Sequence, residues 1–124
     1  MTVAKILVVD DSGYARRLLR QMLEPLGHTV FEAGSGMAGL EAYAVHAPDV
    51  VLLDLTMEDL GGVEVLTQIK GIDPAARVIV VSADIQRSTG KEVAAAGAFR
   101  FLAKPADRDE LVEAVDAALV REGP

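Results

Sequence analysis

Three carboxylates and one lysine stand where apolar runs of this chain end. Asp10 and Asp11 follow one run, Asp54 follows another, and Lys104 follows the last. If the runs are parallel strands of one open sheet, their carboxyl ends meet at a single site. Clustered carboxylates repel one another unless a cation joins them, and Mg²⁺ is often held by one or two carboxylates together with phosphate oxygens. The spacing predicts a Mg²⁺ site at which the lysine completes the surroundings of a phosphoryl group.

Short apolar runs rich in β-branched residues indicate the strands that would position this site. Residues 6–9, 50–53 and 78–81 form uninterrupted runs, as in central parallel strands covered on both faces. Residues 29–32 and 99–102 interleave polar and apolar side chains, which is typical of strands at a sheet edge. Five strands are therefore expected.

Helical periodicity occupies the segments between these runs. The first apolar stripe extends from Ala15 to Leu26, with Ser12 expected to cap the helix and Gly27 to end it. Further stripes lie within residues 40–47, 63–69 and 111–119. The resulting alternation of strands and helices predicts a right-handed βα repeat with helices on both faces of the sheet.

The helix before Gly97 has the weakest pattern. Gly90 costs a helix interior about 1 kcal/mol relative to alanine, and Thr89 with Glu92 fits a capping box. We therefore expect this helix to span only residues 91–96, after a long polar loop over residues 84–90. That loop begins beside the predicted site, where a change of shape would cost little.

Size and composition exclude several classes of function. The chain has 124 residues, the size of one domain, and 1–124 is expected to form a single unit. It contains no cysteine, which excludes disulfides, thiolate catalysis and zinc–thiolate sites. His28 and His46 lie beside Gly27 and Pro48 and are expected to be solvated turn residues.

Charge and hydropathy bear on partners and location. The formal net charge of −7 argues against non-specific binding of nucleic acid. No apolar stretch approaches the roughly 20 residues of a membrane helix, and the N-terminal residues lack the features of a signal peptide. A cytoplasmic protein without membrane or nucleic-acid contacts is expected.

Taken together, these residues match a known family. Over nearly its whole length the chain resembles the receiver domain of two-component response regulators, in particular the single-domain, CheY-like members. The segments that carry the resemblance, each at the expected strand end and in the expected order, are 9–12, 53–57, Gly62, 82–83 and 104–105. The resemblance implies a flavodoxin-like, doubly wound α/β fold whose five parallel strands have the order 2-1-3-4-5.

The resemblance also implies a phosphoacceptor and a metal site. Asp54 would accept the phosphoryl group, since a carboxylate can attack phosphorus and form an acyl phosphate. Asp10, Asp11, Asp54 and the backbone carbonyl of Thr56 would hold Mg²⁺ as the cofactor. The cation is needed because phosphoryl transfer depends mainly on positioning and charge neutralisation.

Three further residues match the family's phosphoryl-binding and switch positions. Lys104 would pair with the phosphoryl oxygens, and its bond to Pro105 is typically cis in the family. Ser82 would hydrogen-bond the phosphoryl group, and Phe101 matches the switch aromatic. The chain departs from the family at Glu58, where proline is usual, at Ser82, where threonine is commoner, and at Phe101, which lacks a tyrosine hydroxyl.

The implied function is that of a signalling switch and not of an enzyme acting on other substrates. A histidine kinase or phosphotransfer protein would donate the phosphoryl group. Ser82 and Lys104 would then move, and the surface of the fourth helix, fifth strand and fifth helix would change its affinity for a protein target, with chemotaxis or motility as an implied pathway. Hydrolysis would reset the switch.

Other readings of the same residues fit less well. A haloacid-dehalogenase-type phosphatase would place two aspartates two residues apart after the first strand, whereas Asp10 and Asp11 are adjacent. A flavin-binding electron carrier would need a hydroxyl-rich phosphate loop there. A degenerate receiver that only binds partners would not need the acids and Lys104. The chain could be a stand-alone regulator or a fragment of a longer one.

Overall fold

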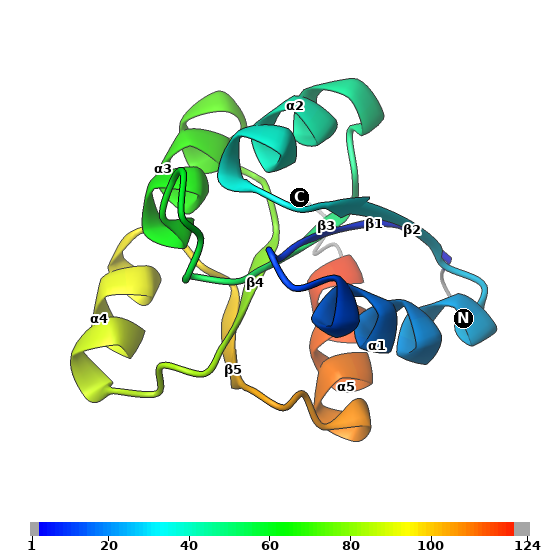
Figure 1. Ribbon diagram of the computed structural model, residues 1–124. Coiled ribbons are helices and arrows are strands. Elements are labelled where there is room, and N and C mark those ends of the chain that lie inside the picture. Colours follow the sequence, from blue (N-terminus) through cyan, green and yellow to red (C-terminus); the bar gives the residue numbers. More distant parts are fainter. Residues whose placement is uncertain (1–2, 121–124) are drawn as a thin grey trace.

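The computed structural model describes residues 3–120, which alternate between strands and helices along the chain (Figure 1). The elements in order are β1 (Lys5–Val9), α1 (Gly13–Leu23), the short 3₁₀ helix η1 (Glu24–Leu26), β2 (Thr29–Ala33), α2 (Gly36–His46), β3 (Val50–Leu53), α3 (Gly62–Ile72), β4 (Val78–Ser82), α4 (Arg87–Ala95), β5 (Arg100–Ala103) and α5 (Arg108–Leu119).

The five strands form one parallel sheet in the order β2-β1-β3-β4-β5. This is the order that the resemblance implied, and the two runs with interleaved polar residues are the edge strands β2 and β5. Every residue of β3 and β4 is buried, because helices cover both faces of the sheet. The predicted fold class is confirmed.

The strand alternation divides the core between the two faces. In β1, Ile6 and Val8 belong to the cluster that α1 and α5 cover, whereas Leu7 and Val9 belong to the cluster that α2, α3 and α4 cover. In Figure 1, α1 and α5 lie below the sheet and α2 and α3 above it, with α4 beside β5. None of the described helices has the length and apolar character needed to cross a membrane.

The first helix begins as predicted and ends with a change of geometry. Ser12 is its N-cap, and its hydroxyl oxygen accepts a hydrogen bond from the backbone N–H of Ala15 at 3.1 Å. The α-helix stops at Leu23, and Pro25 lies in the 3₁₀ turn that follows. Gly27 then closes this turn with a φ of 96°, a left-handed conformation that glycine adopts without strain.

The prediction for α4 was wrong at its start. The helix begins at Arg87 and not at Lys91, so the loop before it is shorter than expected. The carboxylate of Asp84 accepts hydrogen bonds from the backbone N–H of Gln86 at 3.1 Å and from the hydroxyl of Thr89 at 2.9 Å. Thr89 therefore joins the first turn to Asp84 instead of capping a later helix.

The prediction for the two histidines was also wrong in part. His28 is buried, and its Nδ1 accepts a hydrogen bond from the backbone N–H of Ala4 at 3.1 Å. His46 is the last residue of α2, is half-buried, and stacks on Phe31 with ring centroids 3.9 Å apart. His28 does lie between two elements, as predicted, whereas His46 belongs to α2. The contacts of the two imidazoles with Ala4 and Phe31 were not predicted.

Candidate metal and phosphoryl site

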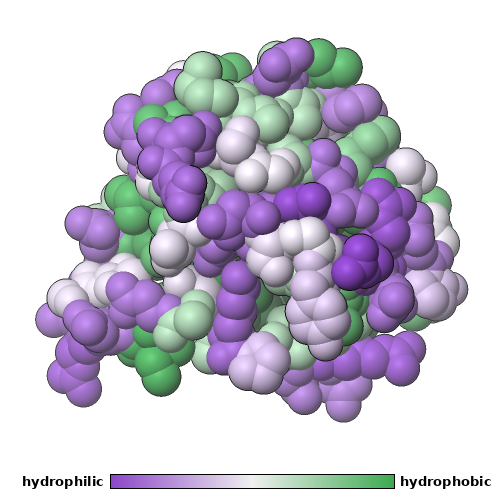
Figure 2. Space-filling view, viewed as in Figure 1, coloured by the Kyte–Doolittle hydropathy of each residue, from purple (hydrophilic) through white to green (hydrophobic). Residues whose placement is uncertain are grey.

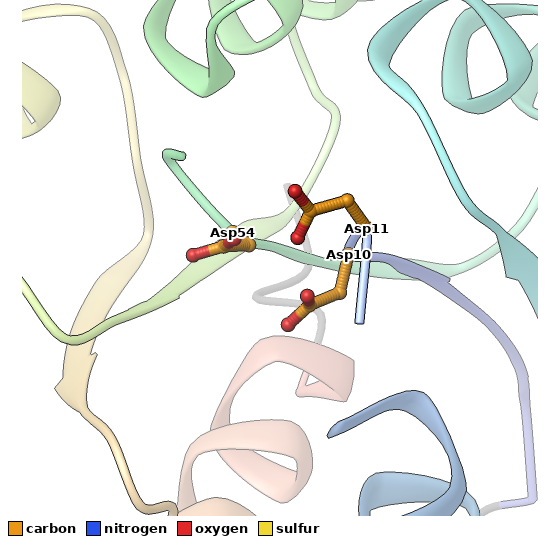
Figure 3. A group of neighbouring side chains, drawn as sticks. All are labelled: Asp10, Asp11 and Asp54. Atoms are coloured by element: carbon orange, nitrogen blue, oxygen red, sulfur yellow. The ribbon is translucent and has the colours of Figure 1, made fainter. Parts of the chain in front are cut away.

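The carboxyl ends of two neighbouring strands bring three aspartates together. Val9 of β1 pairs with Leu53 of β3, so the residues that follow these two are adjacent at the sheet edge. Asp10, Asp11 and Asp54 each offer a carboxylate oxygen, and these atoms all lie within 4.8 Å of one another (Figure 3). The backbone N–H of Asp54 also donates to the carbonyl of Val9 at 2.9 Å, which ties the third aspartate to the first strand.

Burial makes the cluster electrostatically costly. Asp10 and Asp54 are only 2% and 5% exposed, whereas Asp11 is exposed. Burial raises the pKa of Asp54, and the nearby charge of Asp10 raises it further, although Lys104 acts in the opposite direction. A hard divalent cation that prefers oxygen donors would relieve this repulsion, so the donor set fits Mg²⁺.

Lys104, which directly follows β5, supplies a positive charge to the same carboxylates. Its Nζ lies 2.7 Å from Oδ2 of Asp10 and 3.5 Å from Oδ1 of Asp54. Burial alone would lower the pKa of Lys104, but the hydrogen bond to Asp10 and the two carboxylate charges raise it, so the lysine is an ammonium. Its backbone N–H donates to the carbonyl of Ser82 at 2.9 Å, and its bond to Pro105 is cis.

The other residues singled out from the sequence lie on three separate segments: β4, the loop after β3, and β5. Ser82 ends β4, is completely buried, and its hydroxyl oxygen accepts from the backbone N–H of Asp84 at 3.1 Å. Thr56 is exposed in the loop after β3, and its backbone hydrogen-bonds the carboxylate of Asp54. Phe101 is half-buried in β5, where its ring faces Gly90 of α4.

Gly62, the first residue of α3, explains how closely that helix approaches the site. A Cβ on Gly62 would collide with the backbone carbonyl of Asp54 and with Cα of Leu55. The backbone N–H of Gly62 donates to the carbonyl of Leu55 at 3.0 Å. A side chain at this position would push the helix away from the main chain that carries Asp54.

Two residues with a part in the geometry of the site were not found from the sequence. Asp59 accepts hydrogen bonds from the backbone N–H groups of Gly36 and Met37, both at 3.0 Å, and so joins the loop after β3 to the first turn of α2. Arg16 donates from Nη1 to the carbonyl of Asp10 at 2.6 Å. Neither residue lies at a strand end, so the pattern of acids and lysine at strand ends gives no signal for them.

Comparison with known proteins identifies the family. The family model for the response regulator receiver domain matches residues 6–116. The chain belongs to this family. Receiver domains are signalling switches of two-component systems, and they bind Mg²⁺ at an acidic pocket such as the one formed here by Asp10, Asp11 and Asp54.

Relatives of two kinds resemble the chain. It is 38% identical over 116 residues to the chemotaxis protein CheY of Bacillus subtilis, covering 93% of this chain and 97% of that protein. It is 39% identical over 119 residues to the DNA-binding transcriptional regulator NtrC of Azospirillum brasilense, covering 96% of this chain but 25% of that protein. The match therefore includes both receiver-sized proteins and much longer regulators.

Solved structures agree with the fold. The structure of the CheX–CheY–BeF₃–Mg²⁺ complex from Borrelia burgdorferi contains a chain that matches with a TM-score of 0.90 and 32% identity, covering 94% of this chain and 90% of that chain. The chain described here is thus a CheY-like receiver in fold as well as in sequence. CheY-like receivers interact with kinases and with downstream targets.

Proposed function

We propose that the protein is a phosphoaccepting receiver in which Asp54 takes a phosphoryl group from a phosphohistidine of a histidine kinase or phosphotransfer protein. The observation that carries this proposal is the burial of the Asp54 carboxylate between two further aspartates and the ammonium of Lys104. A lone carboxylate in this position would be hard to ionise, but with cationic partners it is a competent nucleophile.

The residues that would hold Mg²⁺ are Asp10, Asp11, Asp54 and the backbone carbonyl of Thr56. When bound, the ion supplies charge neutralisation for the phosphoryl oxygens. Asp10 is held for this task by two contacts: its Oδ1 accepts from the backbone N–H of Ser12 at 2.9 Å, and its Oδ2 accepts from Lys104. These two contacts fix the orientation of the Asp10 carboxylate within the cluster without a bound ligand.

The transfer step is a substitution at phosphorus. A carboxylate oxygen of Asp54 attacks the phosphorus, the phosphorus–nitrogen bond to the donor histidine breaks, and the neutral imidazole leaves with a proton from water. Lys104 and Ser82 pair with the phosphoryl oxygens of the resulting acyl phosphate. Water later attacks this phosphorus, releases phosphate and restores the carboxylate, so the chain catalyses only its own phosphorylation and dephosphorylation.

The output is a change at the surface formed by α4, β5 and α5. Movement of Ser82 toward the phosphoryl group pulls the loop that leads to α4, and Phe101 becomes more buried beside it. The weak anchoring of α4, in which Val93 is the buried residue, supports this view because little packing opposes a shift. The CheY relatives suggest that the protein target belongs to chemotaxis or motility.

The proposal is tested by intact mass after incubation with acetyl phosphate, with and without Mg²⁺, for the wild type and for Asp54→Asn. The expected result is one phosphoryl adduct that requires Mg²⁺ and is absent from the variant. No adduct in the wild type, with Mg²⁺ binding shown separately, would favour a degenerate receiver that binds its partners constitutively.

A further inference from the structure

Arg16 of α1 connects the main chain of the acidic cluster to the edge strand β2. Its Nη1 donates to the backbone carbonyl of Asp10 at 2.6 Å, and its Nε donates to Oε1 of Glu32 at 2.9 Å. The side chain is 21% exposed, so the guanidinium lies against the protein surface and not in bulk water. A planar guanidinium with two fixed partners constrains both of them.

The carbonyl of Asp10 belongs to the peptide unit that joins Asp10 to Asp11. The two side chains leave this peptide in different directions, one on each side of the main chain, and Asp54 lies beside them (Figure 3). A rotation of the peptide would therefore displace both carboxylates relative to Asp54. The carboxylate of Asp10 has its own contacts with Ser12 and Lys104, whereas that of Asp11 is exposed and depends more on the main chain.

The absence of a side chain at Gly34 leaves room for the guanidinium of Arg16. A Cβ on Gly34, directly after β2, would lie 3.2 Å from Nη1 of Arg16, closer than an ordinary van der Waals contact. Glu32 is held from its other side as well, because its Oε2 accepts from Nε of Arg20 at 2.7 Å. Glu32, which accepts a hydrogen bond from Arg16, is thus also held by a second arginine.

We propose that Arg16 is a positioning residue, which holds the peptide between Asp10 and Asp11 in the orientation that binds Mg²⁺ and so supports phosphoryl transfer to Asp54. This inference rests on the proposed function. Arg16 lies outside the acidic cluster and acts on it through the main chain.

The electrostatic effect of Arg16 and its proposed positioning effect predict opposite changes in Mg²⁺ affinity when Arg16 is replaced. Removal of a positive charge close to a cluster of carboxylates should strengthen cation binding, by Coulomb's law alone. Loss of a hydrogen bond that orients the ligands should weaken it, and outer contacts of this kind typically contribute 10- to 100-fold to metal affinity. The sign of the change therefore identifies which effect Arg16 has.

The experiment is a calorimetric titration of the full chain with MgCl₂ for the wild type, Arg16→Gln, Arg16→Lys and Arg20→Gln. Arg20 is the matched control, since it also binds Glu32 but its hydrogen bonds run to Glu32 and Glu24 and not to Asp10. We expect both Arg16 variants to bind Mg²⁺ about tenfold more weakly, with the lysine failing because it lacks the guanidinium fork. Arg20→Gln should stay within about twofold of the wild type.

The outcomes separate this inference from the function on which it rests. Wild-type affinity or tighter binding in Arg16→Gln, or an equal loss in Arg20→Gln, would overturn the role of Arg16 while leaving the receiver intact. A wild type that neither binds Mg²⁺ nor accepts a phosphoryl group would overturn the proposed function itself. Thermal midpoints measured for the same samples ensure that every titration uses folded protein, and Arg16→Lys keeps the test open if Arg16→Gln is unstable.

Discussion

The ammonium of Lys104 bridges two buried carboxylates, 2.7 Å from Asp10 and 3.5 Å from Asp54, although it follows Asp10 by 94 residues. The parallel sheet makes this possible, since it brings the carboxyl ends of β1, β3 and β5 to one face of the molecule, where Figure 2 shows hydrophilic residues across the middle. In the proposed function this lysine would compete with Mg²⁺ for carboxylate oxygens and would also pair with phosphoryl oxygens.

Replacement of Lys104 by alanine should separate acceptance of the phosphoryl group from signalling. Without the competing ammonium, Mg²⁺ should bind several-fold more tightly, and intact mass should still show the adduct with acetyl phosphate. The change at α4 should be lost, because no cation draws β5 toward the phosphoryl group. Hydrogen exchange of α4 with and without acetyl phosphate measures this, with the exposed Lys91→Ala as control; a full response in Lys104→Ala would remove the role given to the lysine.

Asp54→Asn should stabilise the fold while abolishing phosphorylation. The pKa of Asp54 is raised by burial and by Asp10, so the folded state takes up a proton more readily than the unfolded chain, and the ionised carboxylate lowers stability above that pKa. We expect a gain on the order of 1 kcal/mol, about 4 °C in thermal midpoint, at pH 7.

The pH dependence gives the check on that mechanism. The gain should shrink as the pH falls through the raised folded-state pKa of Asp54, and it should be absent below about 4, where Asp54 is protonated in both states and carries no penalty. Asp116→Asn, an exposed aspartate of α5, is the control and should show no such pH-dependent gain. A variant less stable than the wild type at pH 7 would mean that Lys104 compensates Asp54 fully.

The sequence was sufficient to predict what the parallel sheet determines. Strand ends marked by Asp10, Asp54 and Lys104 were expected to meet because uninterrupted apolar runs indicate parallel strands, whose carboxyl ends share one edge of the sheet. The strand order itself came from the family resemblance. The contacts that were not predicted are hydrogen bonds in which a side chain of one element binds the backbone of another element. The bonds from Asp59 to α2 and from Arg16 to the Asp10 carbonyl are of this kind.

The error at α4 has a local cause. Propensity placed the start of the helix after Gly90, but the hydrogen bonds of Asp84 begin the helix at Arg87, before the glycine. The cost of a glycine in a helix, about 1 kcal/mol, is small enough for such contacts to outweigh. His28 was misplaced because its partner is distant in sequence: its Nδ1 accepts a hydrogen bond from the backbone N–H of Ala4, 24 residues earlier.

Asp59→Ala should loosen the loop that follows Asp54. The hydrogen bonds from Met37 and Gly36 lower the pKa of Asp59, so its contribution to stability is present above the unfolded-state pKa near 4 and is lost as the pH falls through the folded-state value. The variant should have a lower thermal midpoint at pH 7 and little difference at low pH. Glu58→Ala, the exposed neighbouring acid, is the control; equal midpoints for the two variants would contradict the tie to α2.

Tyr43→Phe should remove a contact between α2 and Asp73, the C-cap of α3, and should also reduce the loss of stability at alkaline pH. The hydroxyl of Tyr43 in α2 donates to Asp73 at 3.1 Å, and burial together with this acid raises the pKa of Tyr43 to about 12. The wild type should lose on the order of 2 kcal/mol of stability between about pH 10 and pH 12, where only the unfolded chain ionises this phenol.

The control for Tyr43 is the second tyrosine of the chain. Tyr14 is 66% exposed, so Tyr14→Phe should leave the alkaline loss unchanged, whereas Tyr43→Phe should reduce it. Urea unfolding at pH 7, 10 and 12 provides the measurement for all three proteins. If the wild type and Tyr43→Phe lose stability in parallel across this range, the phenol of Tyr43 is not the group responsible.

Gly90→Ala should restrain the switch by filling the space between α4 and β5. A Cβ at this position would lie 3.4 Å from the ring of Phe101, and the substitution also adds up to about 1 kcal/mol of helix propensity. Phe101 then has less room to move, and α4 is harder to displace. We expect slower hydrogen exchange in α4 and a smaller change in that exchange on phosphorylation.

Gly71→Ala provides the matched control for this effect. Gly71 lies in α3, and a Cβ there would meet nothing within 4 Å, so the substitution adds helix propensity without a contact to Phe101. Hydrogen exchange with acetyl phosphate and Mg²⁺ should show the full response of α4 in Gly71→Ala and a reduced one in Gly90→Ala. An undiminished response in Gly90→Ala would mean that α4 and Phe101 move together, so that the gap at Gly90 does not limit the switch.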